Sequence, residues 1–217
     1  MLGRSVVLLL CCTVGLLMGC KEKSTHSNSP LEELKLGNQR FLTGSPIHPH
    51  ETLERIRALK KGQHPIAVIV SCSDSRVPPE LIFDQGLGDI FSVRTAGNVI
   101  GDYELGSIEY AVEHLGCKLI LVLGHQDCGA VKAYLQDTTS HYRFDHIKHL
   151  VDYIAKEEEE RELDHPTLAK AVEANMLHGV HLLSQSEPIL KSALQKKQIA
   201  IVGALYDIET GKVEFSH

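Results

Sequence analysis

The sequence predicts an α/β fold with a mostly parallel central sheet of four strands, an antiparallel edge strand and flanking helices. Two apolar runs, 66–70 and 119–123, show no alternation of polar and apolar residues. Such runs are typical of strands buried on both faces, which occur in parallel sheets covered by helices. Amphipathic segments separate the runs, as the crossover connections between parallel strands require.

The remaining elements follow from local patterns along the chain. Apolar residues at helical spacing predict helices, and short apolar runs closed by Gly or by a turn predict strands. The predicted helices cover residues 31–42, 52–60, a short segment after 78, 104–115, 129–135, 144–154, 168–183 and 189–195. The further predicted strands are 90–95, 199–205 and the antiparallel 213–215.

The composition indicates one well-buried domain. The chain has 217 residues, of which 43% are hydrophobic, enough for one α/β domain but not for two comfortable ones. Its formal net charge of -6, without a basic block, argues against a nucleic-acid partner and favours a small or neutral one. We therefore assign residues 31–217 to a single domain.

The first twenty residues differ from the rest of the chain. Arg4 is their only charge, and the apolar stretch that follows ends in Gly19-Cys20, which resembles the signal of a bacterial lipoprotein. The resemblance implies that residues 1–19 are a signal peptide, that Cys20 is lipidated, and that the polar residues 20–30 form a tether. The protein would then be exported and lipid-anchored to a bacterial membrane, facing the periplasm. The alternative is an uncleaved anchor.

Three other cysteines lie in the predicted domain: Cys72, Cys117 and Cys128. An odd set does not form a disulfide framework. Cys117 lies beside a predicted core strand and is more typical of a small buried hydrophobe than of a ligand. The other two cysteines need a different explanation.

Cys72 follows the first apolar run, whereas His125 and Cys128 follow the second. Because the carboxyl ends of parallel strands meet at one edge of a sheet, we expect these three side chains to converge. Thiolate and imidazole ligands favour zinc, which binds four ligands in a tetrahedron. We therefore predict one zinc ion per chain, held by these three residues, in a zinc-dependent catalytic domain.

Asp74 determines which kind of zinc site this is. If Asp74 is a permanent fourth ligand, the metal is structural; if Arg76 holds the carboxylate by two parallel bonds, the fourth position is open to water. The spacing of these two residues favours the second case. Asp74 and Arg76 are therefore predicted to be catalytic, with Asp74 a metal ligand only in a closed state.

Two motifs, Cys72-Ser73-Asp74-Ser75-Arg76 and His125-Gln126-Asp127-Cys128-Gly129, resemble those of the β-class carbonic anhydrases. The likeness also includes residues 34–41, 93–98 and 206–213. It implies a β-carbonic anhydrase-like fold and the zinc-dependent, reversible hydration of carbon dioxide to bicarbonate and a proton. Two alternatives are a carbonyl sulfide or carbon disulfide hydrolase of the same family and a non-enzymatic lipoprotein that binds zinc or bicarbonate.

The resemblance further implies a plant-like substrate pocket, formed by Gln63, Phe91, Tyr110 and the backbone of Gly129. Taken alone, Phe91 and Tyr110 would be interpreted as ordinary core residues. Together with Gln63 they match an apolar pocket in which one amide donates a hydrogen bond to carbon dioxide.

The family also implies two properties beyond the site. Some members have a non-catalytic bicarbonate pocket built partly from a Trp and a Gly, but the corresponding residues here are Ile69 and Ser71, and the chain contains no Trp. We therefore expect that this pocket does not form, although Arg94 is present.

The helices before the first strand usually pack on a neighbouring copy in this family, which implies a homodimer or a homotetramer.

Overall fold

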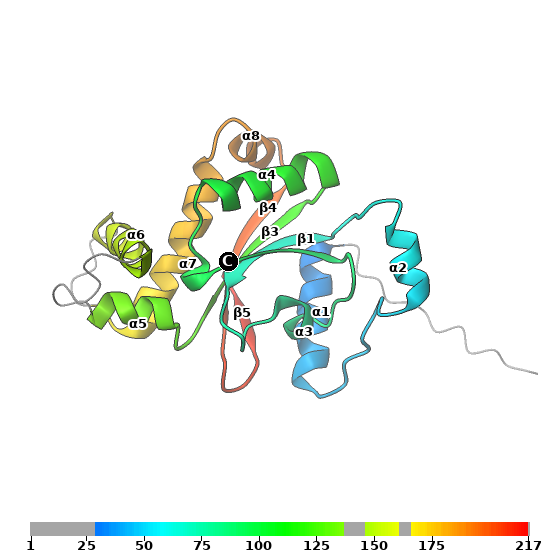
Figure 1. Cartoon of the computed structure of the whole chain (residues 1–217), viewed down its shortest axis with the longest axis horizontal. Coiled ribbons are helices and arrows are strands. Elements are labelled where there is room, and N and C mark those ends of the chain that lie inside the picture. The colour runs from blue at the N-terminus through cyan, green and yellow to red at the C-terminus, as the bar shows by residue number, and fades with distance from the viewer. Residues whose placement is uncertain (1–28, 137–145, 161–165, 217) are drawn as a thin grey trace, which may run out of the picture.

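The computed structural model describes residues 29–136, 146–160 and 166–216. Its centre is one sheet of five strands in the order β2-β1-β3-β4-β5 (Figure 1). The first four strands pair in parallel and β5 pairs antiparallel to β4, as the sequence predicted. The strands are β1 Ala67–Cys72, β2 Ile90–Thr95, β3 Leu119–His125, β4 Ala200–Tyr206 and β5 Val213–Phe215.

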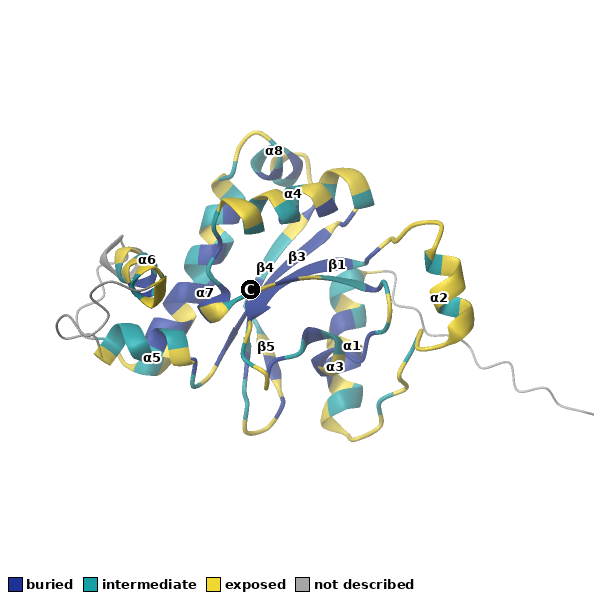
Figure 2. Cartoon of the chain, in the orientation of Figure 1, coloured by how far each residue is buried: buried dark blue, intermediate teal, exposed yellow. Residues whose placement is uncertain are grey.

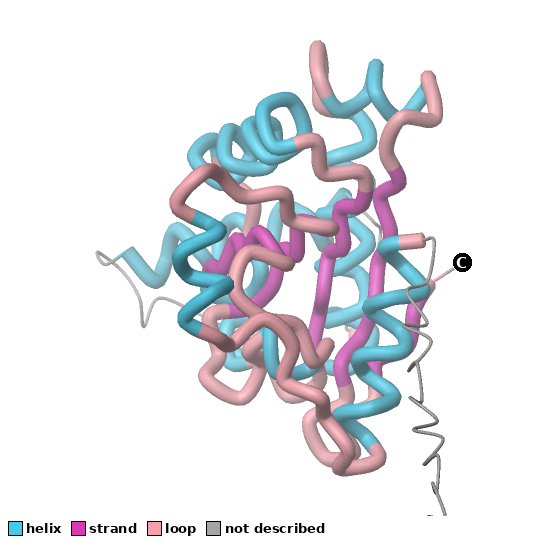
Figure 3. The backbone as a smooth tube through the Cα atoms, turned by 90° about the vertical axis from the view of Figure 1, so that its right-hand side faces the viewer, coloured by secondary structure: helices cyan, strands magenta, loops and turns pink. Residues whose placement is uncertain are grey.

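Helices cover both faces of the sheet (Figure 3). One face packs against α4, α7 and α8, and the other packs against α1 and α3. The helices are α1 Pro30–Leu42, α2 Leu53–Leu59, α3 Pro79–Ile82, α4 Asp102–Leu115, α5 Gly129–Gln136, α6 His146–Glu160, α7 Leu168–Gln185 and α8 Leu190–Gln195, with a 3-10 turn η1 at Ala96–Asn98. Each predicted helix is present, although residues 144 and 145 of the predicted 144–154 helix lie outside the described residues.

The two central strands are buried at every position (Figure 2), which explains why their sequences show no alternation. A third apolar cluster lies beyond their carboxyl ends, where side chains of α5, α6 and α7 surround two cysteines. This cluster contains Cys72, Cys128, Val131, Ile154, Ala171 and Val172. The fold therefore encloses the ends of β1 and β3 in apolar packing.

The two helices before β1 differ in how far they pack against the rest of the chain. In α1, Leu34 is fully buried and Asn38 donates hydrogen bonds to the carbonyls of Ile82 and Gly211, so this helix packs on its own chain. In α2 no residue is buried, and Leu53 and Ile56 are 65% and 53% exposed. Both helices expected to pack on a neighbouring copy leave apolar side chains uncovered, since Leu36 and Leu42 of α1 are also 37% and 42% exposed.

None of the helices in the described part of the chain is long and apolar enough to cross a membrane. The predicted signal peptide at residues 1–19, Cys20 and most of the tether at 20–30 lie outside the described residues. The lipoprotein signal therefore stays a prediction.

Candidate metal centre

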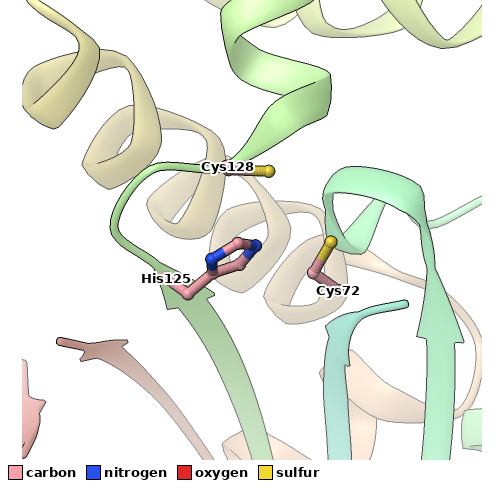
Figure 4. A group of neighbouring side chains, drawn as sticks. All are labelled: Cys72, His125 and Cys128. Atoms are coloured by element: carbon pink, nitrogen blue, oxygen red, sulfur yellow. The ribbon is translucent and has the colours of Figure 1, made fainter. Parts of the chain in front are cut away.

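The three predicted ligands converge at the carboxyl edge of the sheet. Cys72 is the last residue of β1, His125 is the last residue of β3, and Cys128 directly precedes α5. Their ligand atoms lie within 4.8 Å of one another, and all three residues are buried. Figure 4 shows the two sulfur atoms and the imidazole pointing toward one another. Within the described residues, this is the one group of three or more such side chains that could hold a metal ion.

The hydrogen bonding of His125 leaves its Nε2 nitrogen available as a metal ligand. Its Nδ1 lies 2.8 Å from the carbonyl oxygen of Gln126, which can only accept, so Nδ1 carries the proton. Its Nε2 is buried and has no hydrogen-bond partner. An unsatisfied buried nitrogen is unfavourable unless something binds it, and a metal ion satisfies this need. Two sulfurs and one imidazole nitrogen therefore fit zinc.

The two thiols of the cluster shift each other's pKa in opposite directions. The pKa of Cys72 is lowered to about 4 by a hydrogen bond from Cys128, which outweighs the opposing effect of burial, together with smaller contributions from the His125 side chain and two backbone amides. The same bond to Cys72 raises the pKa of Cys128, as does its burial. In contrast, burial alone raises the pKa of Cys117 to about 11, and its Sγ contacts the carbonyl of Pro65. Cys117 is thus a core residue, as predicted.

Two backbone amides also donate to the sulfur of Cys72. The N–H of Asp74 lies 3.4 Å from Sγ, and the N–H of Gly97 lies 3.3 Å from it. Gly97 belongs to η1 and has φ 68°, a left-handed conformation that favours glycine. A Cβ on Gly97 would lie only 2.9 Å from the Cβ of Ala130, so the turn is in close contact with α5.

Arg76 holds the carboxylate of Asp74 by two parallel bonds. Its Nε lies 3.0 Å from Oδ1 and its Nη2 lies 2.7 Å from Oδ2, and its backbone N–H donates to Oδ1 at 2.9 Å. These bonds lower the pKa of Asp74 to about 2. Asp74 is therefore an ionised carboxylate bound to Arg76, the second of the two arrangements that the sequence allowed.

Two charged residues near the site were not assigned to the catalytic machinery from the sequence, where Arg94 appeared only in connection with a bicarbonate pocket that was expected not to form. Arg94, at the end of β2, donates to the carbonyl oxygens of Cys72 and Asp74 over 2.8 to 3.2 Å and so braces the backbone of this loop. Asp127 forms ion pairs with Lys132 and, at 3.6 Å, with Arg76. Both residues lie inside the motifs that carry the family resemblance, but no spacing rule indicates what they contact.

The predicted substrate pocket is only partly assembled in one chain. Gly129 begins α5 next to Cys128, whereas Gln63 is exposed on the loop before β1, at the opposite end of this strand from Cys72. Phe91 is paired with Val68, four residues before Cys72, which corresponds to roughly 13 Å at about 3.3 Å per residue. Tyr110 lies on α4 and is 50% exposed. A single chain therefore does not bring Gln63 and Phe91 to its own metal centre, and it leaves Tyr110 half exposed.

Comparison with known proteins identifies the family. The sequence profile described as carbonic anhydrase matches residues 67–213, more than half of the chain. The solved structure of the β-carbonic anhydrase CcaA has a TM-score of 0.66 and 28% identity to this chain, covering 87% of it and 96% of CcaA. The chain belongs to the β-class carbonic anhydrase family.

Similar members of the family occur in mycobacteria. Carbonic anhydrase 2 of Mycobacterium tuberculosis H37Rv is 39% identical over 193 residues, which cover 87% of this chain and 92% of that protein. A carbonic anhydrase of Mycolicibacterium smegmatis is 59% identical over 102 residues, spanning 47% of this chain and about half (50%) of its relative. A carbon disulfide hydrolase structure, at 20% identity and a TM-score of 0.51, shares the fold alone.

The ligand set predicts the metal content of two cysteine variants. Cys128→Ser removes one of three ligands and should lose most of the bound zinc, because two protein ligands hold it far more weakly than three. Cys117→Ser is the matched control, since it alters an equally buried thiol that lies outside the cluster. Elemental analysis of both proteins after dialysis measures the zinc per chain. A normal zinc content in Cys128→Ser would exclude this residue as a ligand.

Proposed function

We propose that this member of the family catalyses the reversible hydration of carbon dioxide to bicarbonate and a proton. The observation that carries the proposal is the buried cluster of Cys72, His125 and Cys128 beside a carboxylate that an arginine holds by two bonds. A lipoprotein that only stored zinc or bicarbonate would need no such pair of Asp74 and Arg76.

The residues around the metal divide the work of the reaction. Cys72, His125 and Cys128 would hold zinc, which when bound would supply a Lewis acid and activate water. Asp74, ionised and oriented by Arg76, accepts a hydrogen bond from the attacking water and thereby aligns it. Because the pKa of this carboxylate is about 2, it stays ionised at neutral pH and acts as a hydrogen-bond acceptor, and the proton of the reaction passes to solvent. Because Arg76 holds the Asp74 carboxylate, it would keep Asp74 from becoming a metal ligand.

The pocket for carbon dioxide is completed by a second copy of the chain. Gln63, Phe91 and Tyr110 lie away from the metal centre of their own chain, and the apolar face of α2 has no cover. A homodimer, or a homotetramer built from such dimers, buries this face and places these side chains in the site of the neighbour. Mixing Gln63→Ala with Asp74→Asn, each of reduced activity, tests this arrangement, since only a shared site restores activity in the mixed dimer. Failure to regain activity, or a monomer in sedimentation velocity, contradicts it.

Assays on the zinc-loaded protein test the activity. We expect stopped-flow measurements to show rapid hydration of carbon dioxide. In Asp74→Asn this activity should fall about 10- to 100-fold, because the asparagine amide accepts hydrogen bonds less strongly than a carboxylate and does not pair with Arg76 in the same way. Asp152→Asn, at an exposed residue on α6 that pairs with Lys148, serves as the control and should keep full activity. Hydrolysis of carbonyl sulfide without carbon dioxide hydration would favour the alternative activity.

The Asp74–Arg76 pair also predicts how activity depends on pH. The pKa of Asp74 lies at about 2, below the ordinary value of 3.8, so the pair is complete above pH 4 and is lost only as the pH falls towards 2. Asp74 therefore does not titrate between pH 6 and 9. In this range, activity should follow a single ionisation, that of the water activated at the metal.

Bicarbonate should not make this profile cooperative. Ile69 and Ser71 are fully buried in the sheet, and Arg94 is already bonded to two carbonyl oxygens, so these residues offer no pocket for the anion. Rate measurements across this pH range, with and without added bicarbonate, provide the test. Steep, cooperative inhibition would show that Asp74 moves onto the metal.

We also propose that the protein is exported and lipid-anchored to a bacterial membrane, facing the periplasm. The apolar leader that ends in Gly19-Cys20 supports this localisation. The mature chain should begin at an acylated Cys20 and fractionate with membranes, which intact mass spectrometry of the purified membrane fraction measures. Cys20→Ser should abolish both acylation and membrane attachment. A wild-type chain without lipid would contradict the proposal.

A further inference from the structure

The sulfur of Cys72 depends on a hydrogen bond from a distant segment. One of its two amide donors, that of Asp74, belongs to its own loop, but the other comes from Gly97, 25 residues further along the chain. Hydrogen bonds to a ligand atom orient it and adjust how much electron density it gives to a metal. The position of Gly97 therefore affects the metal centre, and any residue that fixes Gly97 affects it as well.

A buried asparagine on α7 holds Gly97 from the other side. The Nδ2 of Asn175 donates to the carbonyl oxygen of Gly97 over 2.8 Å. Asn175 is 4% exposed and lies among buried residues of α7, including Ala174 and Met176, so its side chain has little freedom to move. Gly97 is thus fixed through both of its backbone polar groups: its N–H contacts Cys72 and its carbonyl contacts Asn175.

We infer that Asn175 is a positioning residue of the metal centre, which acts by fixing Gly97 so that the amide of Gly97 points at the sulfur of Cys72. The inference rests on the zinc site of the proposed function. Without the amide of Asn175, the left-handed turn at Gly97 loses an anchor, and the N–H···S bond lengthens or tilts. Cys72 is then less firmly oriented, and its sulfur gives more electron density to the metal.

A second buried asparagine provides a matched control. Asn38 is also 4% exposed and also donates to backbone carbonyls, those of Ile82 and Gly211, but none of its partners touches a metal ligand. Replacement by aspartate keeps the shape of either side chain and, in the ionised carboxylate, replaces its donor by an acceptor, whereas Asn175→Ala and Asn38→Ala remove the donor in every protonation state. Asn175→Asp and Asn38→Asp should both lower the melting temperature, because each leaves buried carbonyls without a partner. Only Asn175→Asp should alter the metal centre.

The experiment uses Co²⁺ and Zn²⁺ as probes on the full-length protein. In Asn175→Asp we expect the thiolate-to-cobalt charge-transfer band to move to lower energy and the zinc affinity, measured by competition with a chelator, to fall about tenfold. Asn38→Asp should retain the cobalt spectrum and the zinc affinity of the wild type. If a carboxylate at residue 175 prevents folding, Asn175→Ala should give the same change of spectrum and affinity.

Two results would overturn the inference. One is a cobalt spectrum and a zinc affinity of the Asn175 variant that match the wild type; the other is an equal change in Asn38→Asp, which would assign the effect to general loss of stability. If the wild type itself bound neither metal, the zinc site of the proposed function would fail as well, so the two failures can be told apart.

Discussion

The parallel register of β1 against β3, with Val68 opposite Ile120 and Ser71 opposite Leu123, brings the ends of two buried strands to the same edge of the sheet. Cys72 follows one end of this ladder, and His125 closes the other strand. A slip by one residue would turn Cys72 to the opposite face, because side chains alternate along a strand. The apolar packing on both faces opposes such a slip, so the packing of the sheet also fixes the geometry of the metal ligands.

Residues that act within a short segment could be predicted from the sequence. Cys72, Asp74 and Arg76 lie within five residues, and His125 and Cys128 lie within four, so their relative positions depend on a strand end and one turn. The strands themselves were evident because buried parallel strands are apolar throughout. The structure confirms the predicted sheet, the convergence of the three ligands and the bonds of Arg76 to Asp74.

Residues that act across long distances could not be predicted in this way. Asn175 lies on a helix 78 residues from Gly97, and nothing in its sequence neighbourhood distinguishes it from an ordinary helical asparagine. The contacts of Arg94 are to backbone carbonyls, which carry no sequence signal. The motif resemblance assigned Gln63, Phe91 and Tyr110 to the pocket, but it could not indicate that a single chain leaves them outside its own site.

Opposite charges lie close together around the centre. Two thiolates would offset a bound divalent zinc, Asp74 pairs with Arg76, and Asp127 pairs with both Lys132 and Arg76. Arg94 binds carbonyl oxygens, which carry no net charge, and so leaves one positive charge beside the loop of Asp74. Although Arg94 forms no pocket for an anion, its charge attracts anions from a distance, whereas it does not attract a neutral molecule. Ionic strength should therefore affect the capture of bicarbonate in the dehydration direction, whereas the capture of uncharged carbon dioxide is insensitive to this screening.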